Sequence, residues 1–290
     1  MIPDSLTSMP EPAHQPLQPF AVITGASKGI GAEYARALAA RQFDLLLVAR
    51  DMPRLSQLAT ALRQTYKTTV DVEALDLAQP HAASTLFDKA QHRRKWVDLL
   101  INNAGFGFYG DFATCPISRI QEMLHLHINT VVESIRLFLP AMIERRRGAI
   151  INVASVAGFF PIPYLAEYAA TKAFLLSFSQ ALAEEVRPFG IQVQACCPSQ
   201  TRTDFHETAG FQPSSPLALH SPAQVVQTSL HALSTGRPVV TIGWRGKLFT
   251  LLARLLPHSV LMREAAKRTK PPRAVSGSIP LSASDQGKRW

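Results

Sequence analysis

Tyr168 and Lys172 stand four residues apart, in a stretch whose pattern predicts a helix over residues 166–187. Side chains at this spacing lie on one face of a helix, so the ammonium group would sit beside the phenol. A free tyrosine has a pKa of about 10 and is a poor proton carrier at neutral pH. The neighbouring positive charge favours the phenolate and is expected to bring that pKa closer to the range that acid–base catalysis needs.

Ser155 follows a predicted buried strand and lies thirteen residues before Tyr168. Its hydroxyl can donate a hydrogen bond to a substrate oxygen on which negative charge develops. Together with Tyr168 and Lys172, it suits the reduction of a ketone or the reverse oxidation of an alcohol, with hydride supplied by a cofactor. The structural alternative is that Ser155 caps a loop and that the other two residues form an ordinary helix pair.

A glycine-rich loop, Thr24–Gly31, directly follows the first predicted strand and leads into a predicted helix. Gly25 permits a tight turn, Gly29 lets the backbone approach a pyrophosphate, and Gly31 lets the helix pack closely on the strand. The helix N-terminus presents its N–H groups to the phosphates. The spacing differs from G-x-G-x-x-G, but the flanking strand and helix favour a dinucleotide site over a flexible surface loop.

The end of the second predicted strand carries the residue that selects between the two nicotinamide cofactors. An acidic residue there binds the ribose 2′-hydroxyl of NAD, whereas an arginine suits the 2′-phosphate of NADP. Arg50 at this position and Lys28 in the glycine loop supply two cations, so we expect NADP(H). Asp51 is the competing signal, and we expect it to cap the next helix instead.

Short apolar strands alternate with longer helical patterns along the chain. The strands are predicted at 21–24, 44–50, 69–77, 97–102, 149–153, 191–197 and 238–242. The helices are predicted at 31–41, 52–65, 80–94, 117–147 (as one long helix or two) and 166–187. Gly148 is expected to end the helix over 117–147 in the left-handed conformation. Near-continuous apolar strands separated by helices indicate a parallel sheet covered on both faces. Right-handed crossovers then predict a single α/β domain with a doubly wound sheet.

From Ala21 to about Phe205, the chain resembles the classical short-chain dehydrogenase/reductase family. The resemblance is carried by the glycine loop, by Asn102-Asn103-Ala104-Gly105 after the fourth strand, by Ser155, and by Tyr168 with Lys172. It implies a Rossmann-type sheet of about seven strands and nicotinamide-dependent hydride transfer. The implied catalytic residues are Asn129, Ser155, Tyr168 and Lys172, with Asn129 positioning a water that links Lys172 to solvent.

The resemblance also implies contacts to the cofactor. Asp76 and Leu77 resemble the pair that contacts adenine, and Thr203 is a better match than Thr201 for the threonine that holds the nicotinamide carboxamide. The chain has Pro198-Ser199 where the family usually has Pro-Gly, which restricts that turn. The expected cofactor-binding residues are Gly25, Ser27, Lys28, Gly29, Ile30, Gly31, Arg50, Asp76, Leu77, Asn103, Ala104, Gly105, Tyr168, Lys172, Pro198 and Thr203.

Charge is distributed unevenly over the 290 residues, whose net charge is +9. Residues 1–244 hold 20 basic and 19 acidic residues, whereas residues 245–290 hold 10 and 2. A nearly neutral body gives no reason to expect a nucleic-acid-binding face. The basic amphipathic helices predicted over 245–270 would either lie on an anionic membrane surface or pack on the body, and we expect packing.

Four segments are expected: a flexible leader over 1–19, an NADP-binding domain over 20–244 with a substrate flap at about 207–222, the basic helices, and a disordered tail over 271–290. No stretch reaches the roughly 18 apolar residues of a membrane-spanning helix. Cys115, Cys196 and Cys197 form a poor disulfide framework, which favours a reducing, cytoplasmic compartment, with membrane-peripheral contact as an option.

Aromatic residues gather on the expected substrate side, at Phe106, Phe108, Tyr109, residues 159–164 and Phe205. They suit a small lipophilic carbonyl compound or alcohol, or else complete the core or a subunit contact. No metal site is expected, and His125 and His127 are interpreted as structural. The family resemblance makes a homodimer or homotetramer the expected assembly. The alternative to an enzyme is a catalytically silent NADP(H)-binding sensor or scaffold.

Overall fold

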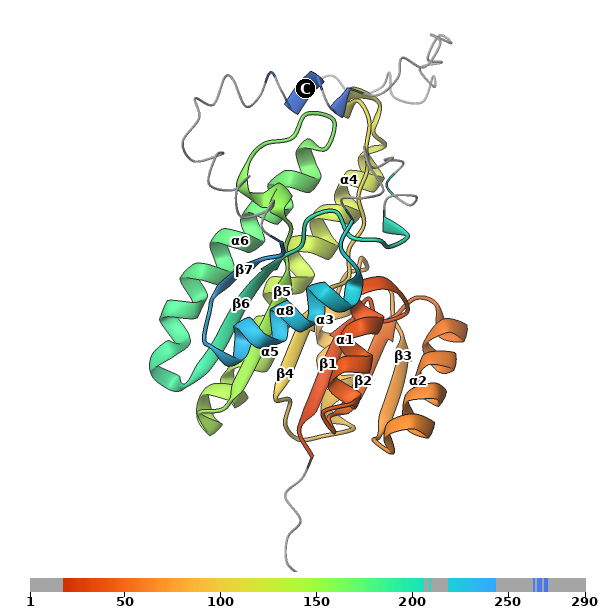
Figure 1. The fold of residues 1–290 in the computed structure, drawn as a ribbon, viewed down its shortest axis with the longest axis vertical. Helices are drawn as coiled ribbons and strands as arrows, with labels where there is room; N and C mark the ends of the chain where they lie inside the picture. Colours follow the sequence, from red (N-terminus) through yellow and green to blue (C-terminus); the bar gives the residue numbers. More distant parts are fainter. Residues whose placement is uncertain are drawn as a thin grey trace, which may run out of the picture.

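The computed structural model describes residues 18–205, 209, 219–243, 263, 265–267 and 269–270. Seven parallel strands form one sheet in the order β3-β2-β1-β4-β5-β6-β7 (Figure 1). The strands are β1 Phe20–Thr24, β2 Asp44–Ala49, β3 Val70–Ala74, β4 Leu99–Asn102, β5 Gly148–Val153, β6 Ile191–Cys197 and β7 Val239–Thr241. The predicted fold class, a single doubly wound Rossmann-type sheet, is therefore confirmed.

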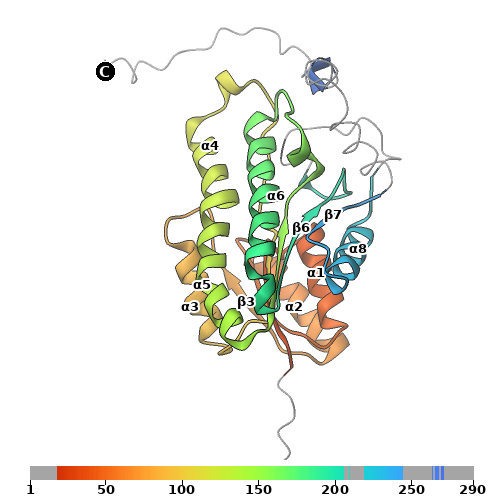
Figure 2. The same cartoon turned by 90° about the vertical axis from the view of Figure 1, so that its left-hand side faces the viewer.

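Helices cover both faces of this sheet (Figure 2). One layer holds α1 Gly29–Ala39, α2 Met52–Tyr66 and α8 Pro222–Ser234, and the other holds α3 Ala82–Gln91, α4 Ile117–Leu124, α5 Thr130–Arg145 and α6 Ala166–Val186. Successive strand residues alternate between the two cores, as the pleat requires. Leu46 and Val48 pack on the α3–α6 side, whereas Leu45 and Leu47 pack on the α1–α2 side.

Strand β1 marks the point at which the direction of winding reverses. It pairs with β2 on one side and with β4 on the other, although β2 and β3 come between β1 and β4 in the chain. At such a switch point the loops that leave the carboxyl ends of neighbouring strands turn apart and open a crevice. The loops after β1 and β4 therefore form the expected place for a ligand.

Helices α4 and α5 are continuous through a π-helical turn, His125–Asn129. Among the described residues, this helix, Ile117–Arg145, is the one segment that is long and apolar enough to cross a membrane by length and composition. The sequence interpretation had excluded any such segment. The helix packs against α3, α6 and β5, and this packing is that of a core helix. A π turn inside an α-helix often marks a functional position.

One local expectation was wrong, and one helix was missed. The left-handed residue that ends α5 is Arg146, with φ 50°, and Gly148 instead starts β5, where a Cβ atom would clash with Met142. Helix α8 was not predicted at all. Its signal was present, because Ser221 and Gln224 form a reciprocal capping box at its N-terminus.

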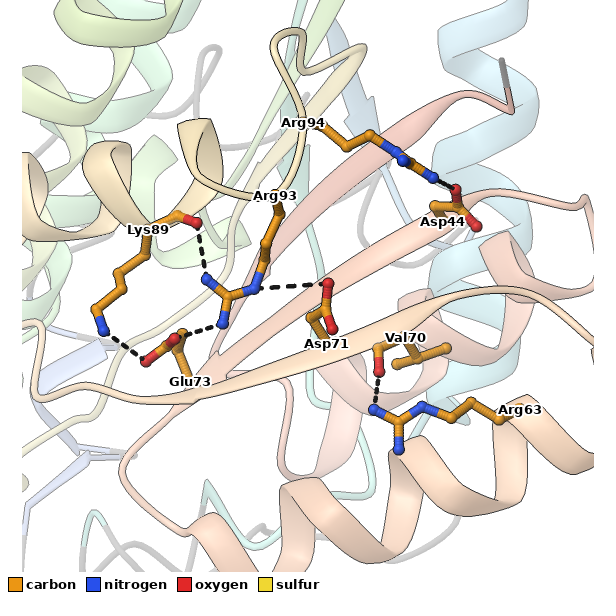
Figure 3. A network of polar contacts seen from close by, with 8 residues as sticks. All are labelled: Asp44, Arg63, Val70, Asp71, Glu73, Lys89, Arg93 and Arg94. Carbon is orange, nitrogen blue, oxygen red and sulfur yellow. Dashed lines mark hydrogen bonds and ion pairs between the residues drawn. The ribbon is translucent and has the colours of Figure 1, made fainter. Parts of the chain in front are cut away.

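Ion pairs cover the edge strand β3 (Figure 3). Arg93, just after α3, reaches Asp71 at 3.5 Å and Glu73 at 2.5 Å, and Lys89 of α3 reaches Glu73 at 3.6 Å. Arg94 also pairs with Asp44 of β2. Charged side chains at an edge discourage pairing with another strand.

Several predicted segments lie largely outside the described residues. These are the leader except for residues 18 and 19, the flap except for 209 and 219–222, the C-terminal helices except for 263, 265–267 and 269–270, and the whole tail. The described part of the flap shows that its last residue, Pro222, is already the first residue of α8.

Candidate active site

The loops after β1 and β4 are locked together by Thr24 and Asn103. The hydroxyl of Thr24 accepts hydrogen bonds from the backbone N–H groups of Asn103 at 2.9 Å and Ala104 at 3.1 Å, and it donates to the carbonyl of Ile101. The side-chain amide of Asn103 donates back to the carbonyls of Thr24 and Gly25. This reciprocal bonding fixes the glycine loop at the crevice between the two strands.

Two glycines of this loop are required because neighbouring backbone atoms lie too close to them to leave room for a side chain. Gly25 has φ +64°, and a Cβ atom on it would lie 2.8 Å from the Cα of Ala104. A Cβ atom on Gly31 would lie 2.3 Å from the carbonyl oxygen of Gly25. A side chain at either position would displace backbone, so the loop is a bare cradle in front of the N-terminus of α1. Its shape and its N–H groups fit a dinucleotide pyrophosphate.

A cavity of about 750 Å³ opens from this cradle. Gly31 does not line the cavity. It packs closely beneath the glycine loop, against the carbonyl of Gly25, where the sequence predicted close packing of helix on strand. The other expected cofactor-binding residues all line it: Gly25, Ser27, Lys28, Gly29, Ile30, Arg50, Asp76, Leu77, Asn103, Ala104, Gly105, Tyr168, Lys172, Pro198 and Thr203.

Ser155, Tyr168 and Lys172 line the same cavity. Ser155 stands just after β5 and accepts a hydrogen bond from the backbone N–H of Ala157 at 3.1 Å, so it also caps a short turn. Tyr168 and Lys172 project from the first two turns of α6. The Lys172 ammonium nitrogen lies 5.6 Å from the centre of the Tyr168 ring and donates to the carbonyl of Val153 at 2.8 Å.

Burial dominates the acid–base properties of this group. It raises the pKa of Tyr168 to about 12, against the lowering effect of a hydrogen bond with Ser155. It lowers the pKa of Lys172 to about 8, against the opposing effect of its interaction with Cys197. The sequence predicted that the lysine lowers the tyrosine pKa, whereas burial raises it. The phenol keeps its proton at neutral pH.

Asn129 is not brought to this site. Its side chain is exposed and lies outside the cavity lining. His127, which was interpreted as structural, is buried and lies beside Tyr168, with ring centres 6.0 Å apart. The sequence held a signal for this difference, since position 127 continues the helical stripe of Met123 and Val131, both buried, whereas position 129 does not.

Cations gather at the other end of the cavity, where Lys28, Arg50 and Arg54 line it. Asp51 accepts a hydrogen bond from the backbone N–H of Arg54 at 3.0 Å, which is the capping role that the sequence predicted. Arg54 was missed by the sequence interpretation. It stands in the first turn of α2, so a cation three residues after the predicted cap was the available signal.

The part of the cavity that is expected to face the substrate is apolar, with Phe106, Phe160, Ile162, Leu165 and Phe205 in its lining. The other expected aromatics are absent from that lining: Phe108, Tyr109, Phe159 and Tyr164. Phe108 and Phe159 pack against the core instead.

Both candidate threonines after β6 line the cavity. Thr203 is the one beside the glycine loop, because a Cβ atom on Gly29 would lie 3.1 Å from its methyl group. Thr201 forms a parallel bridge with His220, which closes the base of the segment predicted as a flap. Among the residues that the structure describes, no group of three His, Cys, Asp or Glu side chains could hold a metal ion.

Comparison with known proteins gives consistent matches. Residues 19–212 match the family model for short chain dehydrogenase. A very-long-chain 3-oxoacyl-CoA reductase from Phaeosphaeria nodorum is 37% identical over 219 residues, which cover 74% of this chain and 63% of that protein. The human protein of the same name is 35% identical over 185 residues, which cover 62% of this chain and 58% of that protein. The chain therefore spans less than two thirds of the length of these relatives.

The matches to two solved structures extend over nearly the whole length of each solved chain. A short-chain dehydrogenase from Sphingobium yanoikuyae in complex with NADPH is 32% identical, with a TM-score of 0.74 over 90% of this chain and 98% of that one. The bulky-bulky ketone specific alcohol dehydrogenase from Comamonas testosteroni is 31% identical, with a TM-score of 0.72 over 90% and 97%.

Proposed function

The chain belongs to the short-chain dehydrogenase family, and we propose on that premise that it transfers hydride between NADP(H) and a lipophilic ketone or secondary alcohol. Tyr168 is the general acid and base of this reaction. The observation that carries the proposal is that Ser155, Tyr168 and Lys172 line the same cavity as the glycine loop. A hydride donor held by that loop and a proton donor on α6 would face one substrate.

The residues of the cavity suggest how the cofactor is held. The pyrophosphate would lie on the glycine loop, the 2′-phosphate near Lys28, Arg50 and Arg54, and the adenine near Asp76 and Leu77. Thr203 is proposed to hold the carboxamide. The bound nicotinamide supplies the hydride for reduction and accepts it for oxidation.

Three side chains are proposed to act around the substrate oxygen, each in a different role. The Tyr168 phenol keeps its proton at neutral pH and can donate it to a carbonyl oxygen that is becoming an alkoxide. The Ser155 hydroxyl donates a hydrogen bond to the same oxygen and stabilises its developing charge. The Lys172 ammonium group stabilises the phenolate that remains. Alcohol oxidation runs through the same groups in reverse.

The substrate is proposed to carry a large apolar substituent. Five apolar side chains line the substrate side of the cavity: Phe106, Phe160, Ile162, Leu165 and Phe205. The relatives are named for 3-oxoacyl-CoA and for bulky-bulky ketones. Both kinds of compound place a ketone next to a bulky group, so they are the first substrates to offer. The expected oligomer remains a prediction, as does the expected packing of residues 245–270 on the body, to which membrane contact is the alternative.

The test is Tyr168→Phe, assayed with NADPH against a panel of 3-oxoacyl thioesters and bulky ketones. We expect a loss of at least about 100-fold in kcat, because general acid catalysis contributes that much, with the NADPH dissociation constant nearly unchanged. Tyr164→Phe, the same change outside the cavity lining, is the matched control. Full turnover by Tyr168→Phe would contradict the proposal. Tight NADPH binding by the wild type without turnover of any substrate would favour the sensor or scaffold alternative.

A further inference from the structure

We propose that His127 is a positioning residue of this active site, which holds the helix of Tyr168 and Lys172 against the loop after β4. The inference rests on the proposed function, because it concerns the geometry of that reaction. In this proposal the residue of the α4–α5 helix that contributes to the site is His127 and not Asn129.

The π turn determines which of the two residues faces inward. Residues two apart on a helix point about 200° away from each other, so burying position 127 exposes position 129. His127 is 1% exposed and is enclosed between the loop after β4 and α6. Gly105 makes room for the ring, since a Cβ atom there would lie 2.8 Å from its Nε2.

The hydrogen bonds of the imidazole fix its protonation. The backbone N–H of Phe106 donates to Nε2 at 3.1 Å, so this nitrogen carries no proton. A neutral imidazole has one donor and one acceptor, so Nδ1 carries the proton and donates to the hydroxyl of Thr171 at 2.9 Å. That hydroxyl in turn donates to the carbonyl of Tyr168 at 2.8 Å. The chain of donors and acceptors is complete only with a neutral ring.

The electrostatic surroundings agree with this assignment. Burial lowers the pKa of His127 well below its usual value, and the positive charge of Lys172 lowers it further. Tyr168 and Lys172, both on α6, face the ring. A protonated ring would turn a donor toward the Phe106 N–H and place a second cation beside Lys172.

His127 therefore joins two walls of the cavity. One wall is the loop Asn103–Phe106, which lines the cofactor side, and the other is the turn of α6 that presents the tyrosine and the lysine. The ring itself is not part of the cavity lining, so it acts through Tyr168 and Lys172 rather than on the substrate. Loss of the hydrogen bonds of His127 should disturb the position of the Tyr168 phenol more than it weakens the binding of substrate or cofactor.

The kinetic test compares His127→Phe with His127→Gln. Phenylalanine keeps the ring shape but has no polar atom, whereas the glutamine amide offers one acceptor and one donor. We expect His127→Phe to lower kcat at least about ten-fold with KM changed by less than about three-fold, since a misplaced phenol stabilises the transition state less without weakening substrate binding. His127→Gln should restore most of that loss. His125→Phe, in the same π turn, is the matched control. Equal kcat for the wild type and His127→Phe, or no rescue by glutamine, would overturn the proposal.

Asn129→Ala tests the competing assignment in the same assay, because a large loss of kcat there would return the role to Asn129. If His127→Phe does not fold, Thr171→Val and Thr171→Ser test the other end of the bond. We expect valine to lower kcat and serine to retain it, and equal rates for the two would overturn the proposal.

A second readout does not depend on turnover. Nitrogen NMR of the full chain labelled in histidine should show His127 protonated at Nδ1 alone, with no titration between about pH 8 and pH 5.5, below the usual histidine value. The opposite tautomer, or titration in this range, would overturn the inference. A wild type that lacks turnover but shows this tautomer would mean that the proposed function has failed while the geometry inferred for His127 stands.

Discussion

Lys28 in the glycine loop pairs with Asp204 at 3.2 Å, which links the cofactor cradle to the segment that follows β6. Arg54 reaches the same carboxylate at 3.7 Å. Both cations belong to the group proposed to bind the 2′-phosphate of NADP. The carboxylate of Asp204 therefore competes with that phosphate for two of its partners, and all three side chains are about half exposed.

Asp204→Asn is expected to tighten NADPH binding. Exposed ion pairs contribute about 0.5–1 kcal/mol, so the expected gain is about two- to five-fold and fades as salt is added. NADH lacks the phosphate, and its affinity should not change. Fluorescence titration of both cofactors at low and high salt measures the effect, with Glu122→Gln as a control outside the cavity lining. An unchanged NADPH affinity at low salt, or equal tightening of NADH, would contradict this prediction.

Arg50→Ala is expected to weaken NADPH binding about ten-fold or more, because a hydrogen bond to a charged group contributes about 1.5–3 kcal/mol. Lys28→Ala should act in the same direction. NADH affinity should stay within about two-fold, since no phosphate is lost with it. Arg36→Ala, which removes an exposed cation from α1, serves as the control. Parallel weakening of NADH and NADPH would show that Arg50 acts on the fold of the site rather than on the 2′-phosphate.

The parts of this fold that the sequence predicted best are those determined by local pattern. Strand β6 was predicted with its observed bounds, because Gly190 and Pro198 punctuate the chain on either side of this short β-rich run. Helix α8 was missed because the Pro- and Ser-containing stretch before it resembles a loop, although that stretch includes its capping box. The cap of α5 was misplaced because Arg146 adopts a conformation that glycine usually takes.

The same contrast holds within the site. The glycine loop and the Tyr168–Lys172 pair each lie within one short segment, so spacing alone predicted where they would stand. The roles of Asn129 and His127 depend on how one helix is rotated against the sheet, and a motif match does not report that rotation. The contact of Asp204 with Lys28 joins residues 176 positions apart, and no local pattern predicts it.

Lys172 is expected to make stability depend on pH in mildly alkaline solution. Its pKa is about 8 in the folded chain and about 10.4 in an unfolded one. Between these values the unfolded chain binds a proton that the folded chain has released, so stability rises with pH there, by roughly 1.4 kcal/mol per pH unit at most. The raised pKa values of Cys196 and Cys197 oppose this contribution from about pH 8.5, and that of Tyr168 opposes it above about pH 10.

Urea unfolding of the wild type and of Lys172→Met isolates this contribution. The difference in unfolding free energy should move in favour of the wild type as the pH rises from about 8 to about 9.5, within the window set by the two pKa values. Lys89→Met, at an exposed lysine of α3, should give a difference that stays flat. A flat difference for Lys172→Met as well would mean that the folded protein does not hold this lysine at a lowered pKa.

Asn152 is expected to be the most sensitive polar position of the core. Its side chain accepts a hydrogen bond from Asn102 at 2.9 Å and donates one to Ser179 at 2.9 Å, which ties β4, β5 and α6 together beneath the cavity. Asn152→Ala leaves the buried amide of Asn102 without its acceptor and opens a small void. We expect a loss of about 2–4 kcal/mol in unfolding free energy.

Gln192→Ala is the matched control, because it removes an exposed amide from the neighbouring strand β6 and should change stability by less than about 0.5 kcal/mol. Chemical denaturation of both variants gives the comparison. Since α6 carries Tyr168 and Lys172, the Asn152 variant should also lose kcat at temperatures where it is fully folded. A folded Asn152→Ala protein with the stability of the control would mean that packing alone, without this polar chain, holds α6 to the sheet.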